Sequence, residues 1–352
     1  MPTICRCIGR LKFTPAKGLE LDRSTLADWV GRAAFLLRPV HKRLLARLKQ
    51  STKLFADETT APVLDPGRGR TKTGQLWAYA RDDRPWGGTD PPAVAYVYAP
   101  DRKAERPIVH LAGFVGILQV DGYAGYRVLA ERGDVELAFC WSHVRRRFYE
   151  LAAAGPAPIA SEALERIAGL YVIEAQIRGR TADERRAVRQ EKSRPIADEF
   201  EPWLRAKLSL ISQKTKLAEA IRYALSRWDG LTRFIADGRI EIDSNVVERA
   251  IRPIALNRKN ALFAGSDGGG EHWGSSSPHC SKPASSSASN PTPISPMSSP
   301  ASSTITRTAR STNCYPGPIS LPKNAGAWPE NIAYPTAVLA GSWSGRATMT
   351  PE

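Results

Sequence analysis

The sequence predicts an α/β protein with a mixed sheet, flanking helices and a helical insertion. Three observations support this fold class. Amphipathic helical patterns occupy residues 21–49 and 141–153. From residue 161 to residue 228 the chain has helical patterns and no candidate strand. Short segments rich in β-branched and aromatic residues form the candidate strands, at residues 53–57, 75–80, 93–99, 116–120 and 135–140.

Composition and charge limit the class of function. The chain has 352 residues, enough for one large or two modest domains, and 50 Lys and Arg against 35 Asp and Glu give a net charge of +15. This balance favours a polyanionic partner, nucleic acid first and an anionic membrane surface second. Since neither a long apolar run nor a signal-peptide pattern occurs, we expect a cytoplasmic protein with no membrane partner. The scattered, odd number of cysteines indicates neither a disulfide framework nor a zinc ribbon.

The N-terminal elements follow from capping residues and periodicity. Asp22 or Ser24 caps a long basic amphipathic helix in which Pro39 is a candidate break. Residues 53–57 predict a short strand that ends in an acid. The glycine-rich, basic residues 65–74 are typical of a hairpin loop. Strands at 75–80 and 93–99 then complete a three-strand meander.

The following elements alternate between strand and helix. Residues 116–120 predict a buried strand that ends at Asp121, residues 126–132 a short helix, and residues 135–140 a strand that leads directly into the helix 141–153. The helical residues 161–228 resemble an insertion inside an α/β domain more than a linker.

A helix near the end of this pattern has an acid set among basic residues. Residues 239–242 could return to the sheet just before it. Asp243 or Ser244 caps the helix and Pro253 is expected to end it. Glu248 lies on its polar face, where an exposed i,i+4 pair with an arginine is the simplest interpretation.

Three acids are candidates for a metal site. Asp57 and Asp121 each end a predicted strand, and Glu248 follows on the helix. Neighbouring strand ends can bring two aspartates within bridging distance, and a packed helix can add the third acid. Such carboxylates require neutralisation, which two Mg²⁺ ions about 3.5–4 Å apart would supply. Taken singly, each aspartate is more often a turn residue at a strand end.

Four segments carry a resemblance to a known family. They read FADETTAPVLDPGRGRTKTGQLWAYARDD, LQVDGYAGY, AFCWSHVRRRFYEL and DSNVVERAIRPIALNRKNALFAGS. Over about residues 19–273, the chain resembles the catalytic domain of insertion-sequence-66 (IS66) transposases, a DDE group with a ribonuclease-H-like fold. The resemblance implies that Asp57, Asp121 and Glu248 are the catalytic triad. It also implies two Mg²⁺ ions as cofactor, with Mn²⁺ as the alternative.

The same resemblance implies a reaction and its partners. Water activated by Mg²⁺ would hydrolyse a phosphodiester at the transposon end, and the freed 3′-hydroxyl would attack target DNA. The DNA partners would be the transposon ends and the target. A homodimer and accessory transposition proteins are further partners that the sequence leaves open. Two other functions also remain open, a ribonuclease-H-like hydrolytic nuclease without strand transfer and a catalytically dead DNA-binding remnant.

Basic and aromatic side chains are candidates for DNA contacts. Those on the Glu248 helix and just after it match basic positions of the family and would bind phosphates, with solvated surface as the alternative. Trp77 would stack on a base, and a core position is an equal alternative. The full set of candidates is Arg68, Arg70, Lys72, Trp77, Arg145, Arg146, Arg249, Arg252, Arg258 and Lys259.

Three further residues lie close to these motifs. Cys140 and His143 form a C-x-x-H pair, but two ligands do not build a zinc site, so we interpret the pair as packing or DNA contact. Glu58 is excluded from the metal site, because neighbouring residues of a strand face opposite sides of the sheet.

Both ends of the chain depart from the family pattern. After Trp273 the sequence is dominated by Ser, Pro and Thr, which is typical of a disordered tail. Serine codons of the TCN type encode apolar residues when read one nucleotide earlier, so residues 275–318 can be re-read as a helical sequence. Residues 4–18 can be re-read in the same way. We therefore hypothesise frameshifted ends around a native frame, which would make the product a truncated, inactive remnant with an intact triad.

The expected organisation has six parts. The ends are a non-native or disordered leader and a Ser/Pro/Thr-rich tail, and the catalytic domain is split by the helical insertion. In chain order the parts are the leader 1–18, a basic helical segment 19–50, the first part of the catalytic domain 51–155, the insertion 156–238, the end of the catalytic domain 239–273 and the tail 274–352.

Overall fold

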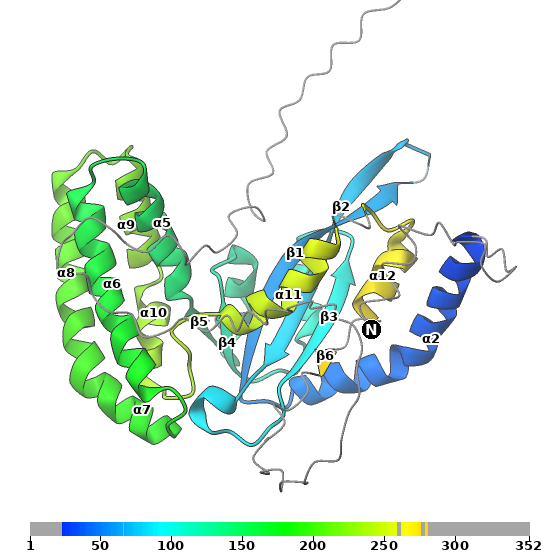
Figure 1. Cartoon of the computed structure of the whole chain (residues 1–352), viewed down its shortest axis with the longest axis horizontal. Helices are drawn as coiled ribbons and strands as arrows, with labels where there is room; N and C mark the ends of the chain where they lie inside the picture. Colours follow the sequence, from blue (N-terminus) through cyan, green and yellow to red (C-terminus); the bar gives the residue numbers. More distant parts are fainter. Residues whose placement is uncertain (1–22, 66, 259–261, 276–278, 281–352) are drawn as a thin grey trace, which may run out of the picture. The chain divides into compact units, whose positions relative to one another are not determined.

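The computed structural model describes residues 23–65, 67–258, 262–275 and 279–280. A mixed sheet with the strand order β5-β4-β1-β2-β3-β6 forms its centre (Figure 1). The prediction of an α/β protein with a mixed sheet and flanking helices is confirmed. The antiparallel part contains β1 (Lys53–Asp65), β2 (Arg70–Arg81), β3 (Ala93–Ala99) and the two-residue β6 (His279–Cys280). β4 (Gly116–Val120) and β5 (Val135–Phe139) extend the sheet in parallel on the other side of β1.

The β1–β2 hairpin is longer than predicted. Pairing continues to Asp65 and Arg70, so the predicted strand 53–57 is too short and the predicted loop 65–74 is wrong over residues 70–74. Alternating burial at Ala61 and Val63 shows that the strand pattern persists beyond Asp57. Cross-strand pairing outweighs the loop-like composition here, because threonines and charged residues suit the exposed end of a ribbon. Asp57 therefore lies inside β1.

One face of the sheet is covered by α11 (Asn245–Asn257) and α12 (Asp267–Ser275). The apolar side of α11 packs on β1 and β2 through Val247, Ile251 and Ile254. The prediction that Pro253 ends this helix is wrong, because the helix continues to Asn257. Packing on both sides of the proline offsets the lost backbone hydrogen bond. The hydroxyl of Tyr96 also donates a 2.7 Å hydrogen bond to the carbonyl of Ala250 in the same stretch.

The other face is covered by α2 (Arg23–Leu48), α3 (Glu105–His110) and α4 (Arg127–Glu131), with a short 3₁₀ turn at Ala124–Tyr126. A second 3₁₀ turn, Arg84–Trp86, lies in the connection between β2 and β3. The helix α2 runs through Pro39 without a break. Leu44, Leu45 and Leu48 anchor its C-terminal half in the core under the sheet. Trp77, Tyr79 and Tyr126 are buried in the same core.

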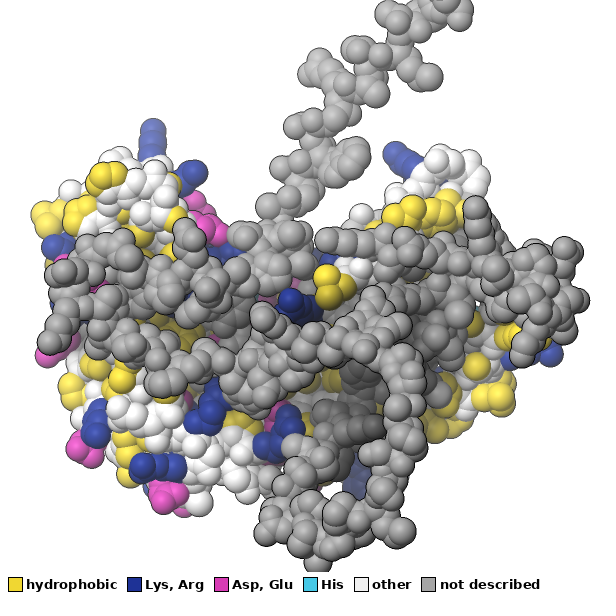
Figure 2. All heavy atoms as spheres, viewed as in Figure 1, with side chains coloured by type: hydrophobic (Ala, Val, Ile, Leu, Met, Phe, Trp, Pro, Cys, Tyr) yellow, Lys and Arg dark blue, Asp and Glu magenta, His cyan; other side chains and the backbone are white. Residues whose placement is uncertain are grey.

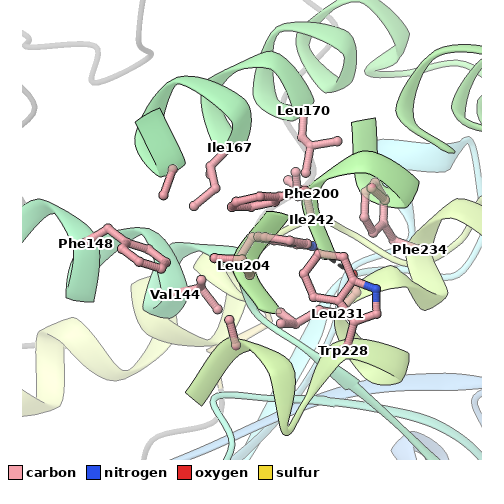
Figure 3. Packing of buried hydrophobic residues seen from close by; sticks show 14 of the residues in the cluster. Val144, Phe148, Ile167, Leu170, Phe200, Leu204, Trp228, Leu231, Phe234 and Ile242 are labelled. Atoms are coloured by element: carbon pink, nitrogen blue, oxygen red, sulfur yellow. Dashed lines mark hydrogen bonds between the residues drawn. The ribbon is translucent and has the colours of Figure 1, made fainter. Parts of the chain in front are cut away.

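Residues 158–236 form only helices, here called the helical part. Its core includes Val144 and Phe148 of α5 (Trp141–Ala153) (Figure 3). Ile117 of β4 and Ala138 of β5 join the same core. The stacked rings of Trp141 and Phe200, with centroids 6.2 Å apart, lie in this core. The helices are α6 (Pro158–Ile177), α7 (Ala182–Val188), a π-helical turn (Arg189–Ser193), α8 (Arg194–Leu210), α9 (Lys216–Leu225) and α10 (Trp228–Ala236).

One predicted strand does not form, and several other predictions concern residues that the structure does not describe. The possible strand at 239–242 is an irregular segment. The leader 1–18, Lys259 and most of the tail 274–352 lie outside the described residues, which include only the end of α12 and the strand β6 of that tail. Among the described residues, no helix combines the length and the apolar character needed to cross a membrane.

Candidate active site

Asp57 and Asp121 are brought together by the pairing of β1 with β4. The parallel register sets Leu54 beside Leu118 and Phe55 beside Gln119. Continued by two residues, this register sets Asp57 beside Asp121, and neighbouring strands lie about 4.8 Å apart. β4 ends at Val120, so Asp121 follows at the carboxyl end of a parallel strand. The two aspartates therefore meet where the ladder between β1 and β4 opens.

Glu248 approaches the same place from α11. Phe55 packs against the buried face of α11. Asp57 lies two residues further along β1 and shares that face of the sheet. Glu248 follows Val247 in the first turns of α11, next to its buried side. The hydroxyl of Ser244 contacts the Glu248 Oε1 atom at 3.4 Å. The structure thus brings together the three acids predicted from sequence.

The mutual repulsion of these acids appears in the protonation of Asp57. Burial raises the pKa of the Asp57 carboxyl well above its usual value, and the charges of Asp121, Glu58 and Glu248 raise it further. A backbone hydrogen bond from Glu58 acts in the opposite direction but does not outweigh them. An uncompensated group of carboxylates is the donor set that a hard divalent cation prefers. Asp57, Asp121 and Glu248 as ligands of Mg²⁺ or Mn²⁺ stay our prediction.

Glu58 lies on the opposite side of β1 from Asp57. Its side chain pairs with Arg102 and accepts a 3.3 Å hydrogen bond from the Tyr126 hydroxyl, beneath the other face of the sheet. Burial and the charge of Asp121 raise the pKa of Glu58, although Arg102 counteracts them. Since Glu58 already has an arginine partner, its exclusion from the metal site stays our prediction.

Cys140 and His143 lie beside Glu248. The sulfur, ring nitrogen and carboxylate oxygen of these three residues lie within 4.8 Å of one another. Burial acts to lower the pKa of His143, but a hydrogen bond with Cys140 and the charges of Cys140, Glu248 and Asp121 outweigh it and raise the pKa to about 9. The C-x-x-H pair thus has a third potential ligand that its sequence spacing does not reveal.

A buried segment fixes the start of α11 against the sheet. Residues 237–244, here called the strap, run past the ends of β4 and β5 without forming a strand. Gln119 donates to the carbonyls of Glu241 and Asp243 at 2.6 and 3.1 Å. The Trp141 backbone N–H donates to Ile242 at 3.0 Å. These bonds replace the strand pairing expected at 239–242 and position Glu248 four residues later.

The strap is also tied to β1 and to the helical part. The buried Lys53 ammonium donates a 2.7 Å hydrogen bond to the Arg239 carbonyl, and burial lowers the pKa of Lys53 to about 8. Arg185 pairs with Glu241 at 2.6 Å. The helical part therefore helps to set the position of the third acid.

The predicted DNA-binding residues of the hairpin differ in their surroundings. Arg68 and Arg70 are exposed near its tip, where basic side chains project from the surface (Figure 2). Lys72 forms a 2.6 Å ion pair with Asp267 and so links the hairpin to α12. These positions leave the two arginines accessible to a phosphate backbone.

The prediction that Trp77 stacks on a DNA base is wrong for this structure. Its side chain is 0% exposed and packs edge-on against His110 and Tyr126. Trp77 alternates along β2 with residues that face α11, so it points into the opposite core. Its sequence alternative, a core tryptophan, describes its position.

The DNA-binding candidates on α5 and α11 differ in exposure, and some of them already form contacts within the chain. Arg145 and Arg146 are half-buried on α5, and Arg146 pairs with Glu150 at 3.0 Å. Arg249 and Arg252 are exposed on α11. Arg258 instead donates a 2.9 Å hydrogen bond to the Thr60 carbonyl and joins the end of α11 to β1. Lys259 lies beyond the described part of α11.

Other cationic residues near Asp121 were missed by sequence reasoning. Arg147 and Arg227 both lie over the Tyr223 ring, each 4.0 Å from its centroid. The Tyr223 hydroxyl donates to the Asp121 carbonyl at 2.8 Å. Arg147 belongs to a run of three arginines that the sequence displays, whereas Arg227 and Tyr223 come from the helical part, where no motif identifies them.

Gly122 allows Arg227 and Tyr223 to pack close to the backbone beside Asp121. It has a φ of +108°, and a Cβ there would lie 2.7 Å from the Arg227 Nε atom and 3.1 Å from the Tyr223 hydroxyl. Any other residue would be strained and would displace both side chains. The Asp-Gly pair at 121–122 therefore serves the contact with the helical part as well as the turn.

Known proteins include relatives that align with most of this sequence. The chain is 50% identical over 264 residues to the uncharacterized protein y4qI of Sinorhizobium fredii (strain NBRC 101917 / NGR234), covering 73% of this chain and 49% of that protein. It is 45% identical over 260 residues to y4jD of the same strain, covering 72% of this chain and 51% of the relative. The chain thus spans about half the length of these relatives.

A family-level comparison covers the sheet, the helical part and α11 together. Residues 10–272 match the transposase IS66 family. The match ends one residue before the boundary predicted at 273, and it begins inside the segment 1–18 that we assigned to a non-native leader. All three candidate acids lie within it. Because the match spans most of the chain, this protein belongs to the IS66 transposase family.

Proposed function

We propose that this chain carries the catalytic core of a DDE transposase, with Asp57, Asp121 and Glu248 as the ligands of two Mg²⁺ ions. The observation that carries the proposal is the convergence of these carboxylates from β1, from the end of β4 and from α11. The net charge of +15 favours DNA as the partner. Membership of the IS66 transposase family supports the same reaction class.

The sheet supports a ribonuclease-H-like fold for this core. Three antiparallel strands come first in the chain, and two parallel strands are then added beside β1. This order places Asp57 on the central strand and Asp121 at the end of its parallel neighbour. The helical part then lies between the second and third acids of the triad, as the family resemblance implies.

Each acidic side chain has its own role in the proposed phosphodiester cleavage. Bound Mg²⁺ would activate the attacking oxygen and stabilise the leaving oxygen. Asp57 and Asp121 are fixed by two hydrogen-bonded strands, so they set the position of the reacting phosphate. Glu248 closes the site from a helix that the strap holds in place. Burial and acidic neighbours raise the pKa of Asp57, and a bound cation would favour its ionised form.

Positively charged side chains beside Asp121 extend the site. Arg147 and Arg227 flank Tyr223, whose hydroxyl bonds the Asp121 carbonyl. We assign these two arginines to phosphates of the DNA strand next to the scissile bond. The exposed Arg249 and Arg252 would contact the backbone further away. Transposon ends and target DNA are the partners in this proposal, which places the reaction in the cytoplasm.

A joining assay tests the proposal. The full chain is given a pre-cut DNA end with a free 3′-hydroxyl, a circular plasmid and Mg²⁺. We expect joined products from the wild type. Asp57→Asn, Asp121→Asn and Glu248→Gln should each lower joining at least roughly 100-fold, because a misplacement of about 1 Å already has an effect of that size. Asp198→Asn, an exposed acid on α8, is the matched control and should join normally.

Other outcomes separate the alternatives. Nicking without joining would identify a hydrolytic nuclease. Equal DNA binding by wild type and variants, with no nicking by any of them, would identify a DNA-binding remnant and contradict the proposal.

A further inference from the structure

A second group of potential metal ligands adjoins the carboxylates. Cys140 follows β5 at the N-cap of α5, His143 lies in the first turn of α5 and Glu248 lies in α11. Their donor atoms lie within 4.8 Å of one another, although they come from two separate parts of the sequence. The strap joins these parts, since the Ser244 backbone N–H donates to the Cys140 sulfur at 3.2 Å. The grouping is therefore held by the fold.

The donor types differ from those of the aspartate pair. A thiol, an imidazole and a carboxylate are the ligands that Zn²⁺ takes, whereas Asp57 and Asp121 offer oxygen alone. A tetrahedral zinc ion with typical bond lengths of about 2.0–2.3 Å separates its ligand atoms by about 3.5 Å. The three donors lie at most 4.8 Å apart, so small side-chain rotations would bring them to that spacing.

The Cys140 sulfur has polar neighbours that would orient it as a ligand. It occupies the N-cap position of α5, where the helix dipole favours negative charge. The Ser142 hydroxyl lies 2.9 Å from the same sulfur, next to the contact from Ser244. Polar neighbours of this kind orient metal ligands and tune their affinity. Only 1% of Cys140 is exposed, which keeps the thiol away from solvent oxidants.

His143 has one nitrogen to spare. Its Nδ1 atom is buried and has no hydrogen-bond partner in the part of the chain that the structure describes. A buried polar atom without a partner is costly, and coordination of a cation by this nitrogen would relieve that cost.

From this geometry we infer that Cys140, His143 and Glu248 form a site for Zn²⁺ or another thiophilic divalent cation. Three protein ligands leave the fourth position open to water. On binding, the Cys140 thiol gives up its proton and His143 gives up the proton on its coordinating nitrogen, and both protons pass to solvent. No oxidant or reductant takes part.

The site shares Glu248 with the carboxylate cluster. Zinc bound to Glu248 withdraws that carboxylate from Asp57 and Asp121, so a thiophilic metal would oppose Mg²⁺-dependent cleavage. This consequence rests on the proposed function. Binding of the metal does not, which allows the two to be tested separately.

Titration of the full chain with Co²⁺ tests the site directly. Cobalt replaces zinc, and its bond to a thiolate produces a charge-transfer absorption band in the near ultraviolet. We expect the band to saturate at one equivalent and to disappear when one equivalent of Zn²⁺ is added. Cys140→Ser should abolish it, and His143→Gln and Glu248→Gln should weaken cobalt binding roughly 100-fold or more. Ser142→Ala, which changes only a neighbour of the sulfur, should weaken it about 10-fold.

Controls make each outcome decisive. Asp57→Asn should keep the band while removing Mg²⁺-dependent joining, which separates this site from the proposed function. Far-ultraviolet circular dichroism of each variant confirms that it folds. Absence of the band in the wild type would overturn the inference. A band that survives in Cys140→Ser would come from one of the other four cysteines and would overturn it as well.

Discussion

The helical part and the acid cluster around Asp57 on β1 both bury charged side chains, but the helical part pairs its acids with bases, whereas Asp57 lies among other acids. In the helical part, Arg189 makes two hydrogen bonds of 2.6 and 2.7 Å with Glu174. Arg185 pairs with Glu241 of the strap at 2.6 Å, so two arginines balance two glutamates. Around Asp57 on β1, negative charges accumulate, and the pKa of Asp57 rises because of burial and these neighbours.

This difference separates structural charges from functional ones. A buried pair is costly to break, because the remaining partner is left without compensation. A group of like charges is costly to keep, and a protein that keeps one gains a site for a ligand of opposite charge. The paired charges therefore maintain the fold, while the unpaired carboxylates point to a cation.

The largest effect is expected from breaking the paired set. Arg189→Met removes both bonds to Glu174 and the bonds to the Phe234 and Asp237 carbonyls. The free energy of unfolding should fall by about 3–5 kcal/mol, measured by urea denaturation. The control is Arg205→Met, which breaks an i,i+4 pair with Glu201 on a side chain that is 62% exposed and should cost about 0.5 kcal/mol. Equal losses in the two variants would show that burial does not distinguish these pairs.

The second prediction concerns the strap, which joins the two regions. Burial raises the pKa of Asp243 to about 6, above the value of about 3.9 expected for the unfolded chain. The folded state therefore binds this proton more tightly, and the stabilisation it brings is present below pH 4 and lost as the pH rises through 6. Between pH 4 and 7, the free energy of unfolding should therefore fall by about 2–3 kcal/mol more in the wild type than in Asp243→Asn.

Denaturation at several pH values measures this slope. Asp57 and Glu58 titrate in the same direction and will leave a residual slope in the variant. An unchanged slope in Asp243→Asn would mean that Asp243 titrates normally and that the strap does not shield it.

A smaller effect should come from the contact between the strap and α7. A Cβ at Gly238 would lie 1.7 Å from the Ala182 carbonyl oxygen, so Gly238→Ala forces the backbones apart. The expected loss of unfolding free energy is about 1–3 kcal/mol. Gly265→Ala is the matched control, because no atom lies within 4 Å of its added Cβ. If the two variants are equally stable in thermal unfolding, the strap is not closely packed against α7.

The helices and strands that the sequence predicted with correct bounds are those whose limits depend on neighbouring residues. The strands 93–99 and 116–120 and the helix 141–153 have the predicted bounds, because each combines a clear hydrophobic period with a defined start or stop. The hairpin loop was predicted too long, since cross-strand pairing at residues 70–74 is not visible in composition. The Pro253 prediction failed because packing of α11 on the sheet is a tertiary effect.

Some residues of the candidate site could be found from neighbouring residues in the sequence, and others are brought together only by the fold. Asp57 and Asp121 could be found because each lies at or near the end of an apolar strand segment, and Glu248 because it follows a cap. The closeness of Glu248 to Cys140 and His143 could not be found, since it depends on the strap. Trp77 could be assigned to either face until the register of β2 was known.

Metal-dependent stability tests the central claim that the three carboxylates form a cation site. Urea denaturation measures the free energy of unfolding of the wild type and of Asp57→Asn, each with and without Mg²⁺ at neutral pH. The comparison without Mg²⁺ reports the repulsion between the acids, and the gain on adding Mg²⁺ reports binding of the cation. Without Mg²⁺, Asp57→Asn should be more stable than the wild type at this pH, because a carboxyl whose pKa is raised by burial and acidic neighbours destabilises the folded state at neutral pH. At a Mg²⁺ concentration about 100 times the dissociation constant, the wild type should gain about 2.7 kcal/mol, and the variant much less. Equal gains in both proteins, or a variant that is less stable without Mg²⁺, would contradict the account.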